Sequence, residues 1–114
     1  MSKESESTSV FKRKYPRKSF QKALSFMCDG AASIGNGVEI GEGGLSFSTD
    51  TKIDVNKKMI VNFFLSDKDF FSVRVTMLNV LSSTKNFTYG ASFDDVSIAL
   101  KRQIRAYVAR TALN

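Results

Sequence analysis

Two runs between residues 58 and 82 place apolar side chains at every second position, and this pattern constrains the fold more than any other feature. Such alternation is typical of a β-strand that buries one face in a core. In "FFSVRVTMLNV" the apolar face is formed by Phe71, Val73, Val75 and Met77. Similar runs recur from Phe20 to Phe93 between turn residues, with no crossover helix between them. The pattern therefore predicts a mainly all-β protein, either a barrel or a sandwich. Of these we expect a mostly antiparallel barrel of about six strands.

The last segment, "DDVSIALKRQIRAYVART", repeats at helical spacing instead. Its apolar stripe consists of Val96, Leu100, Ile104, Tyr107 and Val108. The opposite face is basic and carries Lys101, Arg102 and Arg105. Asp94 or Asp95 is expected to cap the start of this helix. We expect the C-terminal helix to pack across the barrel or to close one of its ends.

Glycine-rich stretches mark the expected turns, and a polar stretch marks the expected tail. "DGAAS" at residues 29–33 and "GNG" at residues 35–37 are turn signals. The opening "MSKESESTSV" is Ser-rich and nearly free of apolar groups, which predicts a flexible tail over residues 1–10. The predicted organisation is that tail followed by one domain over residues 11–114.

Positive charge is concentrated just before the first predicted strand. The formal net charge of +6 favours an anionic partner, such as a nucleic acid, a nucleotide, an anionic membrane or an acidic protein. Residues 12–22 contain no acid and carry these cations: Lys12, Arg13, Lys14, Arg17, Lys18 and Lys22. The simplest interpretation of such a run is a solvated basic linker, so the rest of the chain must decide its role.

The residues needed for catalysis are largely missing from this sequence. It contains no histidine, which removes His-based triads and almost every catalytic zinc site. Cys28 is alone, so a disulfide scaffold is excluded. Asp67 and Asp69 flank Lys68 in a predicted hairpin loop, which is a solvated turn on the simplest interpretation. We therefore expect no enzyme, no metal and no cofactor beyond a bound ligand. With no secretory signal and no apolar run long enough for a membrane span, we expect a cytoplasmic protein.

A cluster of glycines lies between two strand-like runs in "EIGEGGLSF". Gly41, Gly43 and Gly44 have no Cβ, so they permit a turn or a bulge. The same missing atoms allow a ligand to approach the backbone closely. On this stretch alone both interpretations stay open.

Together, the basic run and the glycine cluster resemble the PilZ domain, the bacterial receptor module for cyclic di-GMP. The first mark of that family is R-x-x-x-R before the first strand, which matches Arg13 and Arg17 in "RKYPR". The second mark is D/N-x-S-x-x-G, with which Glu39, Gly41 and Gly44 align. "YGASFDD" looks like the final strand of the family, and a helix follows it as the family expects.

The resemblance extends over residues 11 to about 112 and implies a six-stranded PilZ barrel that binds cyclic di-GMP. A guanidinium can fork onto phosphate oxygens or onto guanine O6 and N7, and its flat face stacks on a base. An ammonium offers neither geometry. Arg13 and Arg17 are therefore the expected specific contacts, and the supporting charge comes from Lys12, Lys14 and Lys18.

The second motif departs from the family at two positions. Glu39 stands where the family has Asp or Asn, and Gly41 stands where it has Ser. Glu39 keeps the acceptor on a longer side chain, whereas Gly41 can offer only backbone groups. In the family those two side chains help to hold a guanine. The alternative hypothesis is therefore a degenerate PilZ adaptor that does not bind the nucleotide and acts through protein contacts.

A third hypothesis is a basic β-barrel that binds single-stranded nucleic acid. Such proteins expose aromatic side chains on which bases stack, whereas most Phe residues here fall on predicted core faces. We therefore expect no DNA or RNA partner. The expected partners are cyclic di-GMP and a downstream protein. The family implies second-messenger signalling that controls motility, surface attachment in biofilms and exopolysaccharide output.

Overall fold

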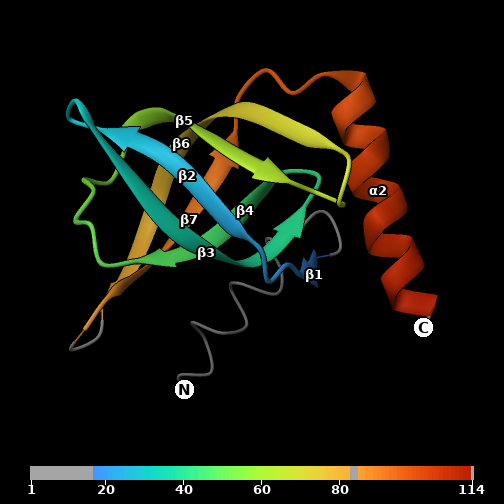
Figure 1. The fold of residues 1–114 in the computed structure, drawn as a ribbon, viewed down its shortest axis with the longest axis horizontal. Coiled ribbons are helices and arrows are strands. Elements are labelled where there is room, and N and C mark those ends of the chain that lie inside the picture. The colour runs from blue at the N-terminus through green and yellow to red at the C-terminus, as the bar shows by residue number, and fades with distance from the viewer. Residues whose placement is uncertain (1–16, 83–84, 114) are drawn as a thin grey trace.

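The strands form a closed antiparallel barrel with a helix beside it, as the alternating pattern predicted (Figure 1). This computed structural model describes residues 17–82 and 85–113. The elements are β1 Arg17–Ser19, β2 Ala23–Cys28, β3 Ala31–Gly41, β4 Gly44–Thr49, β5 Lys58–Phe64, β6 Phe70–Ser82, β7 Phe87–Phe93 and α2 Ile98–Leu113. The expected tail, residues 1–10, lies outside the described residues, as do Lys12, Arg13 and Lys14.

The barrel is closed by strand β3. The sheet order is β1-β3-β2-β5-β6-β7-β4, and β4 also pairs with β3, so that six strands form a ring and β1 is an extra strand. The N-terminal part of β3 pairs with β2, and its C-terminal part lies between β1 and β4. A register shift between Gly37 and Glu39 accompanies this change of partners. The bent strand β3 therefore brings β1 next to the β3–β4 turn.

Aromatic side chains fill the interior of the barrel. The rings that are at most 1% exposed are Phe20, Phe26, Phe47, Phe63 and Tyr89. The Tyr89 hydroxyl accepts the N–H of Ile53 at 2.6 Å and donates to the carbonyl of Thr51 at 3.2 Å. The hydroxyl is thus satisfied inside the core, as a buried polar group must be.

The two glycine turn signals have opposite outcomes. Asp29 and Gly30 form the predicted turn between β2 and β3, with φ angles of 53° and 82°. The prediction of a turn at "GNG" is wrong, because residues 35–37 lie inside β3. At Gly37 an added Cβ would lie 2.4 Å from Cδ2 of Phe20. That glycine is therefore required by close packing of a ring on the strand, not by a change of chain direction.

Helix α2 lies beside β1 and β3 at one end of the barrel (Figure 1). The predicted stripe is confirmed: Leu100, Ile104 and Val108 are buried, and Val96 and Tyr107 pack against the core. The expected cap by Asp94 or Asp95 is wrong. Ser97 Oγ accepts the N–H of Leu100 at 3.1 Å, and the Asp94 carboxylate instead accepts the Thr76 hydroxyl. Within the described residues, no helix combines the length and apolar character needed to cross a membrane.

Candidate functional site

Strand β1 brings Arg17 next to the predicted glycine motif. In the antiparallel register Arg17 lies opposite Gly41, and Ser19 lies opposite Glu39. The Arg17 guanidinium is 3.8 Å from the Glu39 carboxylate, and both side chains are 41% exposed. An ion pair this exposed is weak, so an anionic ligand can compete for the guanidinium. Arg17 is the first residue of a short strand rather than a loop residue.

The motif glycines lie opposite each other at the base of the β3–β4 turn. Gly41 pairs with Gly44 across a tight turn made of Glu42 and Gly43. A Cβ at Gly44 would lie 2.1 Å from the carbonyl oxygen of Ala91, so close packing of β4 on β7 requires this glycine. Gly41 ends strand β3, where the backbone is extended. A side chain at position 41 therefore needs no positive φ.

Lys18, the one predicted supporting lysine within the described residues, lies on the other face of β1. Lys18 pairs with Ile40, a core residue, whereas Arg17 pairs with Gly41 on the outward side. Successive side chains of a strand point to opposite faces. Of the predicted site residues, the structure thus brings together Arg17, Glu39, Gly41 and Gly44. Arg13, Lys12 and Lys14 lie outside the described residues.

A surface hollow of about 200 Å³ borders Arg17 on the wall of β4, β6 and β7. Its polar lining includes Ser46, Asn79 and Thr88, and its apolar lining includes Leu78 and Leu81. The two leucines are 52% and 74% exposed. A cation, hydrogen-bonding groups and exposed aliphatic side chains suit a planar, polar ring that carries a nearby negative charge.

Sequence reasoning missed the residues of this hollow. A register shift between Met77 and Asn79 changes the alternation of β6, so residues after it do not continue the pattern that predicted the core face. A Cβ at Gly90 would lie 2.6 Å from Oδ1 of Asn79, an exposed side chain that can move aside. The only sequence signal was the group of apolar residues Leu78, Val80 and Leu81 around Asn79, which breaks the alternation of the preceding residues.

Helix α2 forms hydrogen bonds with both segments of the candidate site, the β3–β4 turn and β1. Arg105 Nε and one terminal nitrogen each donate to the Glu42 carboxylate at 3.0 Å. These hydrogen bonds, opposed by partial burial, lower the pKa of Glu42. The Tyr107 hydroxyl donates to the carbonyl of Ser19 at 3.2 Å. The β3–β4 turn and β1 are therefore both bonded to one helix.

No group of three or more potential metal-ligating side chains occurs among residues 17–82 and 85–113. Comparison with known proteins gives the chain a family. The PilZ domain family matches residues 11–110, whereas no curated protein sequence matches the chain.

Solved structures with a similar fold include YcgR from Escherichia coli in complex with c-di-GMP, with a TM-score of 0.77 and 12% identity over 90% of this chain and 46% of that one. The Bacillus subtilis inhibitor of motility MotI/DgrA has a TM-score of 0.81 and 10% identity, over 90% of this chain and 52% of that one. The PilZ domain of YcgR from Escherichia coli with c-di-GMP has a TM-score of 0.74 and 13% identity, over 89% of this chain and 94% of that one. The chain thus spans about half the length of the first two proteins.

Proposed function

Because this chain belongs to the PilZ domain family, we propose that it is a receptor for cyclic di-GMP that binds the nucleotide between Arg17 and the outer wall of the barrel. The observation that carries this proposal is the position of Arg17. Its guanidinium borders a hollow and also lies beside the β3–β4 motif. The function is binding and signalling rather than catalysis, in the cytoplasm.

The chemistry of the hollow suits one half of the ligand. A volume of about 200 Å³ is below the roughly 300–1,000 Å³ of pockets that enclose a drug-sized ligand. It therefore accommodates one guanine rather than the whole dinucleotide. Leu78 and Leu81 would contact the face of the base, and Ser46, Asn79 or Thr88 would meet its polar edge. Arg17 would bind a phosphate or stack on the base, and Arg13 would supply the second guanidinium.

The ion pair between Arg17 and Glu39 favours weak binding. A phosphate must compete with the Glu39 carboxylate, which lies 3.8 Å from the guanidinium. Gly41 offers no hydroxyl to the ligand. The same two residues support the second candidate, an adaptor of this fold that has lost the nucleotide and acts through protein contacts.

The burial of the aromatic residues argues against a single-stranded nucleic-acid binder. Among the described Phe residues, most are buried or packed against the core, and the exposed ones are Phe64 and Phe70. These two stack on each other, with ring centroids 4.9 Å apart. A surface for successive bases needs aromatic rings spaced along a groove, and this pair does not supply it.

Isothermal titration with cyclic di-GMP tests the proposal, with GMP and a short single-stranded oligonucleotide as comparison ligands. We expect saturable binding of cyclic di-GMP that weakens in Arg17→Ala. A folded protein that binds none of the ligands would favour the adaptor. Binding of the oligonucleotide as tight as that of cyclic di-GMP would reject the receptor in favour of a nucleic-acid binder.

A further inference from the structure

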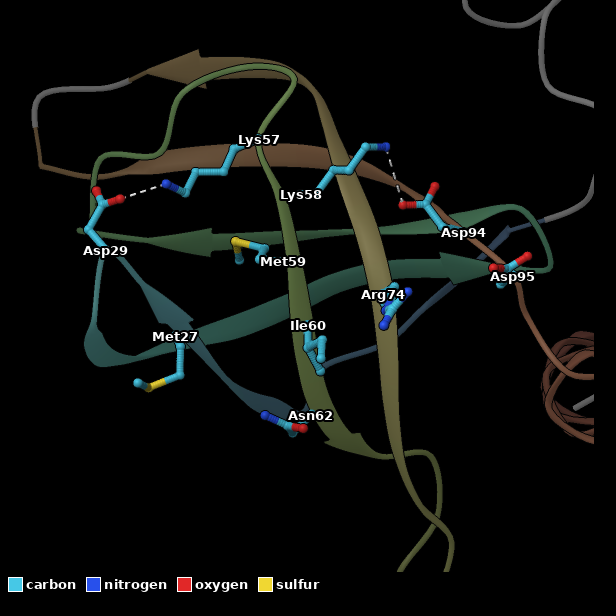
Figure 2. A pocket seen from close by; sticks show the side chains of 10 residues that line it. All are labelled: Met27, Asp29, Lys57, Lys58, Met59, Ile60, Asn62, Arg74, Asp94 and Asp95. Carbon is cyan, nitrogen blue, oxygen red and sulfur yellow. Dashed lines mark hydrogen bonds and ion pairs between the residues drawn. The ribbon is translucent and has the colours of Figure 1, made fainter.

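A large hollow of the described surface lies away from Arg17, on the wall formed by β2, β5 and β6 (Figure 2). Its volume is about 890 Å³. Ile60 on β5 lies opposite Arg74 on β6, and Met27 on β2, which follows the last paired position of β2 with β5, lines the same hollow and completes a row across this wall. Met27 and Ile60 are 57% and 47% exposed. The row therefore presents apolar surface that ends at a cation.

Two of the three cations around this row pair with a carboxylate, and the third, Arg74, does not. Lys57 donates to Asp29 at 2.6 Å, and the Lys58 ammonium lies 3.9 Å from Asp94 (Figure 2). In the part of the chain that the structure describes, Arg74 has neither a hydrogen-bond partner nor an ion-pair partner for its guanidinium. It lies next to Ile60 in Figure 2. The hollow thus combines exposed apolar side chains with a guanidinium that has no partner among the described residues.

The hollow continues toward helix α2. A second hollow of about 270 Å³ shares Arg74, Asp94 and Asp95 with the first and reaches Val96 and Leu100. Together the two hollows extend from Met27 on β2 to Leu100 on α2, which suits an extended chain segment better than a compact molecule.

The shape and charge of this surface exclude several occupants. It is concave, so a second copy that presents the same concave surface would leave it unfilled, since an isologous interface must be self-complementary. Its cations are equalled in number by Asp29, Asp94 and Asp95, so it lacks the one-sided positive charge that binds nucleic acid or an anionic membrane. A convex segment with both apolar and charged side chains remains.

We propose that this hollow, the β2-β5-β6 groove, docks an extended segment of a partner protein in which an aliphatic side chain is followed closely by a carboxylate. The aliphatic side chain packs on Met27 and Ile60, and the carboxylate receives a forked pair of hydrogen bonds from Arg74. Met and Arg are both enriched in protein interfaces, and Arg is among the residues that most often dominate the binding energy. The groove gives the protein an output surface on a different wall from Arg17, and the proposal stands whether or not the nucleotide binds.

Selection of short random peptides on the full chain tests this proposal, followed by titration of the enriched peptides. We expect peptides that pair an aliphatic residue with Asp or Glu. Arg74→Glu should weaken them by about ten- to a hundredfold, as loss of a charge-assisted hydrogen bond predicts. Ile60→Ser, an exposed position, should weaken them as well. Arg102→Glu makes the same change of charge on the exposed face of α2 and should leave binding unchanged.

Four outcomes would overturn the proposal. One is enriched peptides that bind Arg74→Glu as tightly as the wild type, and another is enrichment of basic peptides or of none. The third is a dimer in sedimentation that Arg74→Glu dissociates, which would make a second copy the occupant. The fourth is a vesicle of anionic lipid or a short oligonucleotide that displaces the peptides, which would assign the groove to that ligand instead.

Discussion

Arg105 of helix α2 donates two hydrogen bonds of 3.0 Å to Glu42 in the β3–β4 turn, one to each carboxylate oxygen. The residues are far apart in sequence, yet this contact fixes the helix to the turn that joins Gly41 to Gly44. The Glu42 side chain is only 13% exposed, whereas that of Arg105 is 66% exposed. The contact therefore links the candidate ligand motif to an element that presents a surface to solvent.

Glu42→Gln should lower the free energy of unfolding at neutral pH by about 0.5–1 kcal/mol, the upper range for an ion pair that is partly exposed. The hydrogen bonds from Arg105 lower the pKa of Glu42 from its ordinary 4.5 in the folded state. Its contribution is thus present above the unfolded pKa and is lost as pH falls through the folded pKa. Urea unfolding of both proteins across that range measures the difference, which should shrink toward zero in acid. Asp67→Asn, at an exposed turn, is the control, and a difference that is constant with pH would contradict the assignment.

Arg17→Ala should weaken binding of cyclic di-GMP more than Lys18→Ala. Loss of a charge-assisted, forked contact costs about 1.5–3 kcal/mol, against less than about 1 kcal/mol for an exposed point charge. The register strengthens the comparison, because the two residues lie on opposite faces of β1. Titration calorimetry of both variants measures the affinities. Equal losses would reduce β1 and the basic run to a general electrostatic attraction.

The double change Glu39→Asp with Gly41→Ser should tighten binding of cyclic di-GMP. Aspartate reaches less far toward Arg17 and so competes less with a phosphate, and serine restores a hydroxyl. A neutral hydrogen bond is worth roughly 0.5–1.5 kcal/mol, so the gain for the pair is about three- to thirtyfold. Gly41→Ser alone should not lower the melting temperature through backbone strain, because position 41 lies in extended backbone. A stable double variant that binds no better than the wild type would mean that this motif does not hold the ligand.

Gly37→Ala should destabilise the barrel by about 1–3 kcal/mol, the usual cost of overpacking. The added Cβ would lie 2.4 Å from the Phe20 ring and 2.5 Å from the Phe20 carbonyl oxygen, so backbone must shift as well as side chain. Thermal unfolding measures the effect. Asn36→Ala changes the exposed neighbour and should stay within about 0.5 kcal/mol of the wild type. A melting temperature unchanged in Gly37→Ala would show that the Phe20 contact is easily rearranged.

The sequence alone determined the alternating strands and the helix, because both depend on local periodicity. Alternation in β5 and β6 assigned each side chain to a face, since successive residues of a strand must point to opposite sides. The stripe through Leu100, Ile104 and Val108 did the same for the helix. The motif residues Arg17, Glu39, Gly41 and Gly44 were also identified from the chain, and β1 brings them together.

Only the tertiary structure decided which segments meet. The glycines at "GNG" look like a turn locally, yet the Phe20 ring requires Gly37 in a strand. The bonds from Arg105 to Glu42 and the β2-β5-β6 groove join residues whose separation in sequence has no periodic signal. The register shift at Met77 and Asn79 likewise exposed Leu78 beside Arg17. Local propensity fixes the face of the strand or helix on which each residue lies, whereas closure of the barrel fixes which residues are its neighbours in space. Both candidate binding surfaces combine residues from different strands, so only the tertiary structure could reveal them.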